Sequence, residues 1–294
     1  MITVTFIKDQ KTLLGVKTEK GIMDVEAASV HYPEVQAPLS VKELISRGEE
    51  GKQALMTLVD KSYQETALFY AEEALAFGPC VPEPQKIICV GLNYKKHADE
   101  CNLPYPPAPL LFSKFNNTLA GHGDVIPLPE KASQVDYEAE LAIIIGKEAK
   151  NVKKEEALSF VYGYATADDV SARDLQMKTS QWLLGKTCDK FSPIGPYLVS
   201  VEEVGNPNDL EIRSIVNGEV RQNSHTSDMI FYCDEIISYI SQHFTLNPGD
   251  IILTGTPEGV IMGYPEEKQI WLKDGDEVTI EIGKLGRLTN RFQK

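Results

Sequence analysis

Two glutamates stand two residues apart in an otherwise apolar segment of the chain. Glu138 and Glu140 lie within 135–146, where a β-strand would direct both carboxylates to one face, because successive side chains alternate. The other face would be apolar and consist of Ala139, Leu141, Ile143 and Ile145. Carboxylates this close repel each other, and burying them is costly without a compensating cation. The pair therefore indicates either a solvent-facing acidic end of a strand or part of a cation site.

A second acidic pair, Asp168 and Asp169, follows an aromatic-rich strand. Ser171 and Asp174 resemble a capping box, which predicts that the pair lies where a strand leads into a helix. One aspartate should serve the turn, and the residues alone do not decide which one. Three carboxylates without histidine or cysteine would favour a hard divalent ion, Mg²⁺ or Mn²⁺, with open coordination positions for an oxo acid.

The same repulsion predicts how such a site behaves without its metal. Chelation should abolish activity, and Mg²⁺ or Mn²⁺ should restore it. Replacing Glu138 with alanine should weaken metal binding and stabilise the metal-free protein, because a cluster of like charges is relieved.

His97 and Glu100 are three residues apart, so they can touch on a helix. A carboxylate that orients an imidazole makes it a general base able to activate water, although a single such pair is also common on protein surfaces. The segment 101–109 that follows contains four prolines and should be an irregular loop. We expect 95–107 to form a lid that is mobile without ligand, the alternative being a rigid, proline-braced loop.

The elements that must position these residues are mainly short strands. Asn217-Gly218 between two alternating segments predicts a tight hairpin. Ser40 with Glu43 three residues later predicts the start of a helix. Apolar residues at helical spacing predict a second helix that begins at Ser227 and continues through Ile240.

The chain divides at a proline-rich segment. Residues 1–77 should form a small α/β domain, 78–84 a linker with three prolines, and 85–294 the main domain. The 29 Lys and Arg residues against 43 Asp and Glu residues give a net charge of −14, which argues against a nucleic-acid partner or an anionic membrane. With no basic, apolar leader and no long apolar run, we expect a cytoplasmic protein.

Five motifs, taken in order and spacing, resemble the fumarylacetoacetate hydrolase family. They extend over roughly 85–292 and comprise Gly91-Leu92-Asn93-Tyr94 with His97 and Glu100, Asp136–Leu141, Asp169–Gln176, Gly185-Lys186, and Thr254–Pro257. The resemblance implies an α+β protein with a β-rich, rolled mixed sheet, a smaller N-terminal α/β domain, and a homodimer. It also implies that Glu138, Glu140 and Asp169 hold the metal.

The resemblance further implies roles for individual residues. His97 with Glu100 would be the catalytic, water-activating pair on a loop that closes over the substrate. Lys186 and Gln176 would contact substrate oxygens, and a turn at Gly255 and Thr256 would bind the substrate carboxylate. Lys186 could instead form a salt bridge to one of the acidic residues.

The predicted activity is metal-dependent hydrolysis of a C–C bond in a fumarylacetoacetate- or acylpyruvate-like diketo acid. The alternatives are an oxaloacetate decarboxylase or a 2-hydroxyhepta-2,4-diene-1,7-dioate isomerase of aromatic catabolism, since all begin by chelating a 2-oxo acid. A binding module without catalysis would have no use for the His97–Glu100 pair. Fumarylacetoacetate hydrolase itself adds an aspartate to the metal site, whereas the nearest candidate here is the neutral Asn93.

Overall fold

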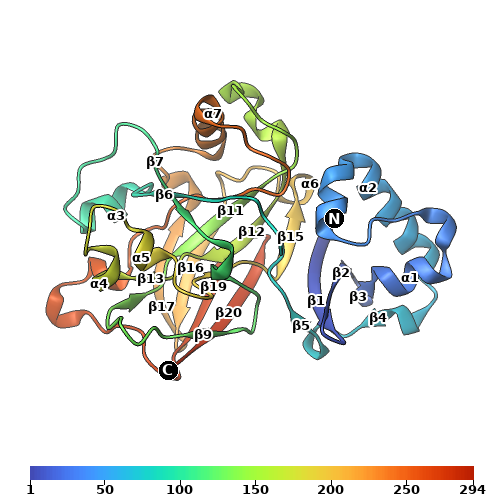
Figure 1. Ribbon diagram of the computed structural model, residues 1–294, viewed down its shortest axis with the longest axis horizontal. Coiled ribbons are helices and arrows are strands. Elements are labelled where there is room, and N and C mark those ends of the chain that lie inside the picture. The colour runs from blue at the N-terminus through green and yellow to red at the C-terminus, as the bar shows by residue number, and fades with distance from the viewer.

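Residues 1–77 form the smaller lobe on the right of Figure 1 in the computed structural model, which describes all residues from 1 to 294. Its strands are β1 (Ile2–Lys8), β2 (Lys11–Thr18), β3 (Gly21–Asp24), β4 (Phe69–Tyr70) and β5 (Ala76–Phe77), and its helices are α1 (Val25–His31) and α2 (Val41–Ser62). Helix α2 begins where the sequence predicts, because Ser40 Oγ accepts a hydrogen bond from the Glu43 N–H at 3.1 Å.

One large mixed sheet runs through both lobes. Its strand order is β4-β3-β2-β1-β15-β12-β11-β18-β6-β7, with β5 also paired to β1. The strands beyond the small lobe are β6 (Ile87–Gly91), β7 (Leu110–Lys114), β11 (Ala139–Ile145), β12 (Val161–Asp168), β15 (Tyr197–Ser200) and β18 (Ile251–Leu253). All pairs are antiparallel except β18 with β6. The mixed, β-rich α+β fold that the sequence analysis expects is therefore confirmed.

The sheet crosses the predicted domain boundary. Strand β1 pairs with β15, with Val4 opposite Tyr197, while 78–84 contain no helix or strand. The lobes are thus joined by backbone hydrogen bonds as well as by the chain. The division into domains at 78–84 stays a prediction.

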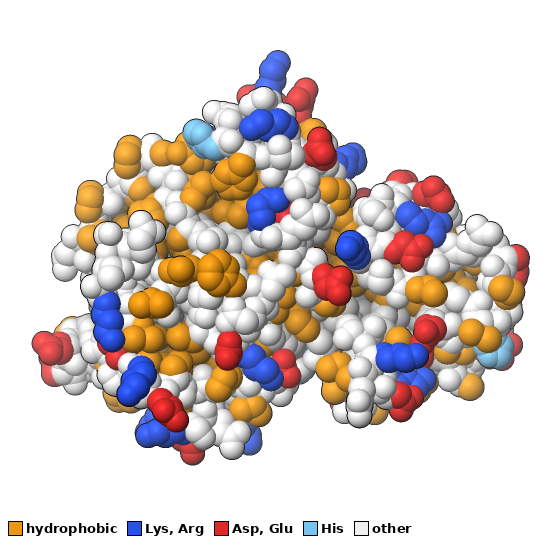
Figure 2. All heavy atoms as spheres, viewed as in Figure 1, with side chains coloured by type: hydrophobic (Ala, Val, Ile, Leu, Met, Phe, Trp, Pro, Cys, Tyr) orange, Lys and Arg blue, Asp and Glu red, His pale blue; other side chains and the backbone are white.

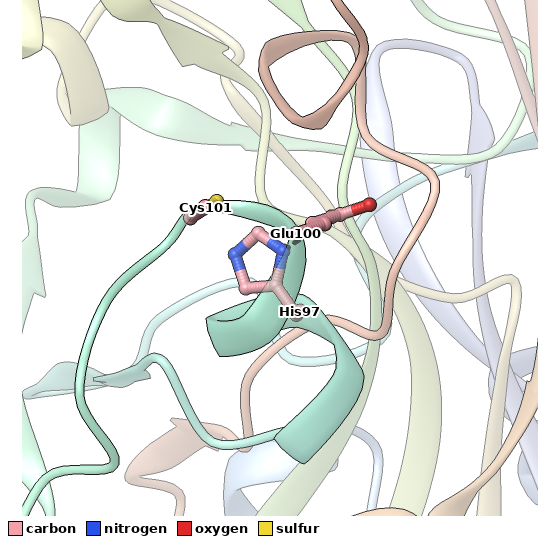
Figure 3. Close-up of side chains that lie close together, drawn as sticks. All are labelled: His97, Glu100 and Cys101. Carbon is pink, nitrogen blue, oxygen red and sulfur yellow. Dashed lines mark hydrogen bonds and ion pairs between the residues drawn. The ribbon is translucent and has the colours of Figure 1, made fainter.

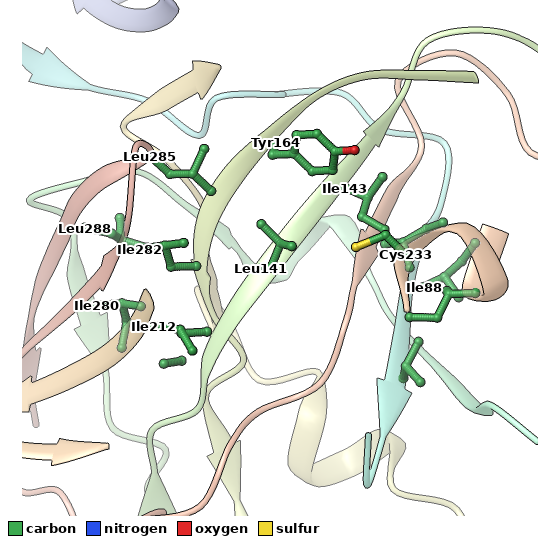
Figure 4. Packing of buried hydrophobic residues seen from close by; sticks show 14 of the residues in the cluster. Ile88, Leu141, Ile143, Tyr164, Ile212, Cys233, Ile280, Ile282, Leu285 and Leu288 are labelled. Carbon is green, nitrogen blue, oxygen red and sulfur yellow. The ribbon is translucent and has the colours of Figure 1, made fainter. Parts of the chain in front are cut away.

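A second sheet packs against the large one. It has the order β17-β16-β19-β20-β9, formed by β9 (Val125–Pro127), β16 (Glu211–Val216), β17 (Glu219–His225), β19 (Glu277–Ile282) and β20 (Gly286–Gln293). The predicted hairpin at Asn217-Gly218 joins β16 to β17, with φ of 50° and 84° at its two residues. Figure 4 shows Leu141 of β11 facing Ile212 and Ile280 of this sheet across the core.

Strand β11 is buried on both faces. Leu141 and Ile143 belong to the core between the two sheets, whereas Ala142 and Ile144 belong to a second core that includes residues of α2. The predicted alternation is therefore correct. Glu140 is only 2% exposed, so the alternative of a solvent-facing acidic strand end is wrong.

Helix α7 (Cys233–His243) begins later than predicted. Ser227 lies in a separate 3-10 turn, and Asn93 holds the chain between this turn and α7 in a non-helical conformation. The Asn93 carbonyl accepts from the Ile230 N–H at 2.7 Å, and its Oδ1 accepts from the Phe231 N–H at 2.8 Å. These bonds occupy backbone groups that a longer helix would need.

The remaining helices and strands are short. The helices are α3 (Lys95–Glu100), α4 (Arg173–Gln176), α5 (Leu183–Lys186) and α6 (Val201–Val204), and the strands are β8 (Leu119–Ala120), β10 (Val135–Asp136), β13 (Ser171–Ala172) and β14 (Ser192–Pro193). None of the helices combines the length and apolar character of a membrane span. On the face shown in Figure 2, basic side chains are interspersed with acidic ones.

Candidate active site

The three predicted metal ligands come together at the ends of two neighbouring strands. Glu138 precedes β11, Glu140 lies within it, and Asp169 follows β12. Because β11 and β12 are antiparallel with Ala139 opposite Asp168, the three side chains converge. One carboxylate oxygen of each lies within 4.8 Å of the others, and all three residues are buried.

The protein supplies its own cations to this cluster. Lys186 Nζ lies 2.7 Å from Glu138 Oε2 and 2.8 Å from Asp169 Oδ2. Arg173 Nη2 lies 2.7 Å from Glu138 Oε1, and Lys114 forms an ion pair with Asp169. The structure therefore predicts the opposite of the expected stabilisation on removing Glu138, because the removal would take one charged partner from each of two buried cations, Lys186 and Arg173.

Sequence reasoning did not assign a site role to Lys114 or Arg173. Both are buried, and both contact a predicted metal ligand. The sequence signal for a site role was weak for both residues. Lys114 is a single lysine at the end of the mainly apolar segment 110–114, and Arg173 lies inside the motif Asp169–Gln176. Lys186 does form salt bridges, with two carboxylates, and its predicted contact with a substrate oxygen stays a prediction.

Glu140 is the carboxylate that the protein compensates least. Its Oε2 accepts one hydrogen bond, from the Gly255 N–H at 2.8 Å. Burial, followed by the charges of Asp169 and Glu138, raises the pKa of Glu140 well above its usual range. Burial would also raise the pKa of Glu138, but Lys186 and Arg173 outweigh it and lower that pKa to about 2. The set of oxygen donors thus fits Mg²⁺ or Mn²⁺, whose charge would let Glu140 ionise.

Asp168 holds the backbone of the site. Its Oδ1 accepts a hydrogen bond from the Glu138 N–H at 2.8 Å, which is the turn role predicted for one aspartate of the pair. The predicted capping box is wrong, because β13 pairs with β10 and keeps Ser171 extended. The Ser171 hydroxyl donates to the Asp169 carbonyl, and Asp174 accepts from the Ser133 N–H.

We expect the metal-free protein to lose stability between about pH 4 and pH 8. Burial raises the pKa of Asp168 to about 8, although the Glu138 N–H and Lys114 oppose the shift. The unfolded chain releases this proton near pH 4 while the folded protein retains it, so stability falls by up to about 1.4 kcal/mol per pH unit as pH rises through that window. Asp168→Asn should flatten a urea-unfolding series across this range, and parallel curves for the two proteins would contradict the assignment.

His97 and Glu100 form the predicted pair on α3. His97 Nδ1 lies 2.8 Å from Glu100 Oε1, and His97 is only 4% exposed, so the pair is not surface decoration. Glu100 Oε2 also accepts from the Gly259 N–H at 2.9 Å, which fixes the carboxylate. An imidazole that donates from Nδ1 to a carboxylate presents Nε2 as its free basic nitrogen.

One small cavity is lined by His97 of the pair and by Glu138 and Glu140 of the carboxylates, but not by Glu100 or Asp169. It has a volume of about 40 Å³, room for a few water molecules. The predicted residues that line it are His97, Glu138, Glu140, Gln176, Lys186 and Thr256. Leu103 of the proline-containing loop also lines it, so the loop contributes a wall. A larger cavity of about 210 Å³ lies beside α2, but its charged lining residues are only Lys42 and Glu83.

The other predicted binding residues differ in the contacts they make. Gln176 lines the cavity, and its Oε1 accepts from Arg173. Thr256 Oγ1 accepts from Gln222 Nε2 at 2.8 Å. Gly255 has a φ of +98°, and a Cβ there would lie 2.7 Å from that of Asn93, so the turn requires glycine. Its N–H donates to Glu140, and its predicted contact with a substrate carboxylate stays a prediction.

A comparison of the sequence with known protein families finds the same family that the motifs resemble. The family described as "Fumarylacetoacetate (FAA) hydrolase C-terminal" matches residues 86–293. The chain belongs to the fumarylacetoacetate hydrolase family. Over 281 residues the chain is 43% identical to the protein of Xenopus laevis named oxaloacetate tautomerase fahd2, mitochondrial. The match covers 94% of this chain and 85% of the relative.

Two solved structures are similar to this chain in different ways. The 2-hydroxyhepta-2,4-diene-1,7-dioate isomerase of Mycobacterium marinum is 38% identical, with a TM-score of 0.66 over 76% of this chain and 80% of the isomerase. The maleylpyruvate hydrolase of Sphingobium sp. SYK-6, in complex with manganese(II) and pyruvate, is 28% identical, with a TM-score of 0.78 over 100% and 99% of the two chains. The chain is therefore similar to proteins named for isomerisation and for hydrolysis.

Proposed function

We propose that this protein interconverts the keto and enol forms of a small 2-oxo dicarboxylic acid such as oxaloacetate. The observation that carries the proposal is one cavity lined by the imidazole of His97, the ammonium group of Lys186 and two carboxylates of the cluster, Glu138 and Glu140. Tautomerisation needs a base that moves a proton and cations that stabilise the enolate, whereas hydrolysis also needs a water molecule placed for attack. The tautomerase relative from Xenopus laevis supports the same choice.

Glu138, Glu140 and Asp169 would hold Mg²⁺ or Mn²⁺, which when bound polarises the oxygens of a 2-oxo acid. His97 would take the proton from the carbon beside the carbonyl and return it, with Glu100 keeping the imidazole in the required tautomer. Burial lowers the pKa of Lys186, but Asp169 and Glu138 outweigh it and raise that pKa. Lys186 would therefore remain an ammonium and stabilise the enolate oxygen by its charge.

Hydrolysis of a C–C bond is the second candidate. The firmly held His97–Glu100 pair suits the activation of a water molecule, and the maleylpyruvate hydrolase with manganese and pyruvate is similar over its whole length. Decarboxylation of oxaloacetate and isomerisation of a hydroxyheptadienedioate need the same cation and oxo-acid contacts. A homodimer and a cytoplasmic location also remain predictions, and the tautomerase relative is named as mitochondrial.

A substrate panel tests the proposal. The purified protein with Mg²⁺ or Mn²⁺ is given enol-oxaloacetate, acylpyruvates and fumarylacetoacetate, while ultraviolet absorbance follows the enol and chromatography follows pyruvate and free acids. We expect rapid loss of enol-oxaloacetate with no pyruvate formed. Pyruvate from oxaloacetate would indicate decarboxylation, and cleavage of an acylpyruvate at a higher rate would favour hydrolysis.

Substrate entry predicts a mobile lid. The cavity has room for only a few water molecules. A dicarboxylic acid can therefore enter only if α3 and the following loop move away. We expect amide exchange at 95–103 to be fast in the Mg²⁺-loaded protein and slower when oxalate, an oxo-acid mimic, is added. Strong and equal protection in both states would favour the rigid loop instead.

A further inference from the structure

The segment that carries the catalytic pair also places a thiol beside it. Cys101 directly follows α3, so His97, Glu100 and Cys101 stand at positions i, i+3 and i+4 and share one side of the helical turn. One nitrogen, one oxygen and the sulfur lie within 4.8 Å of one another. In the view of Figure 3, the imidazole lies between the sulfur and the carboxylate. The proposed reaction makes no use of the sulfur.

The donor atoms differ in chemical type from those of the carboxylate cluster. The carboxylates offer only oxygen, which suits Mg²⁺ or Mn²⁺, whereas a nitrogen, oxygen and sulfur set suits Zn²⁺. Bond lengths of about 2.0 Å to nitrogen or oxygen and about 2.3 Å to sulfur put tetrahedral donors roughly 3.3–3.8 Å apart. The donor atoms lie within 4.8 Å of one another, so side-chain rotations that bring them closer would reach that geometry, with the fourth position left to water.

We propose that His97, Glu100 and Cys101 form an inhibitory Zn²⁺ site separate from the metal centre of the reaction. On binding, the thiol proton passes to solvent, and the thiolate and carboxylate neutralise the ion. Glu100 Oε2 can keep its bond from the Gly259 N–H while Oε1 ligates, so a second contact steadies the ligand. The ion would tie up His97 and hold α3 in place. Only the inhibition rests on the proposed function, since the binding does not depend on it.

Cys101 is the one cysteine that is both accessible and part of a group of three possible ligand atoms. Cys80, Cys89 and Cys233 are fully buried, which leaves Cys101 and Cys188 within reach of a metal ion from solvent. Cys188 Sγ donates to the Leu184 carbonyl and belongs to no group of three ligand atoms. Cys188→Ser is therefore the matched control for Cys101→Ser.

Cobalt(II) reports thiolate ligation directly. The Mg²⁺-loaded full-length protein is titrated with Co²⁺, and the near-ultraviolet band of sulfur-to-cobalt charge transfer is recorded. We expect the band in the wild-type protein and in Cys188→Ser, its loss in Cys101→Ser and Cys101→Ala, and its displacement by Zn²⁺. A band that persists without Cys101, or that disappears without Cys188, overturns the site, whatever the activity of the protein proves to be.

Inhibition is then measured against Zn²⁺ in excess Mg²⁺, with each variant normalised to its own rate in Mg²⁺ alone. Loss of one ligand should raise the half-inhibitory Zn²⁺ concentration at least tenfold in Cys101→Ser and leave it unchanged in Cys188→Ser. Equal inhibition of the wild-type protein and Cys101→Ser would place the inhibitory ion at the carboxylates and refute the proposal. If no substrate is turned over, the proposed function fails while the cobalt band still decides the binding.

Discussion

Replacing His97 with glutamine is expected to lower kcat for the interconversion of enol- and keto-oxaloacetate by about 10²–10⁴-fold, the usual contribution of a positioned general base. Glutamine keeps a polar side chain of similar reach but has no basic nitrogen to take up a proton. The carboxylates do not depend on His97 for their ion pairs, which are made by Lys186, Arg173 and Lys114. Metal affinity, measured by calorimetry with Mn²⁺, should therefore remain near that of the wild-type protein.

The matched control is His225→Gln. His225 lies on β17, outside the cavity, and its Nδ1 accepts from the Ser227 N–H, so the substitution should leave kcat unaltered. A His97→Gln protein that retains wild-type turnover would show that another group moves the proton. A protein that loses Mn²⁺ affinity together with turnover would show that His97 acts through the metal site instead.

The buried cations beside the carboxylates explain why the sequence alone predicts strong electrostatic repulsion among Glu138, Glu140 and Asp169. Alternation along 135–146 correctly predicts which side of the strand carries Glu138 and Glu140. It does not reveal that Lys114, 55 residues before Asp169 in the chain, meets that carboxylate in the fold. A pairing that depends on strand order in a sheet has no local signature, so the cluster looks repulsive in sequence and is largely neutralised in the structure.

Local signals were reliable where the local chain decides the conformation. The cap at Ser40 and the hairpin at Asn217-Gly218 depend on a few consecutive residues, and both occur as predicted. The helix start at Ser227 failed because a distant residue, Asn93, holds the backbone of 230–231. The cavity volume was equally beyond prediction, because it depends on how the loop after α3 packs against the other walls.

Glu138 and Glu140 provide a matched pair with opposite expected effects on the metal-free protein. Glu138→Gln takes one of two charged partners from each of Lys186 and Arg173, which keep Asp169 and Asp136. The loss of stability should therefore be smaller than the about 3–5 kcal/mol that removing one member of a single buried ion pair typically costs. Glu140→Gln removes a carboxyl group whose pKa is raised chiefly by burial. The unfolded chain gains by ionising Glu140 above its usual pKa while the folded protein retains the proton, so the glutamine variant should be more stable at neutral pH.

Both substitutions remove one of the three predicted metal ligands, so both should weaken Mn²⁺ binding by at least tenfold and lower turnover at limiting metal. Thermal unfolding after chelation separates them: the Tm of Glu138→Gln should fall and that of Glu140→Gln should rise, the rise being larger at pH 7 than at pH 5. Two variants that shift the Tm in the same direction would contradict the division of charge described here. A Glu140→Gln protein with wild-type Mn²⁺ affinity would remove Glu140 from the metal site, since a ligand cannot be exchanged for an amide without loss of its anionic charge.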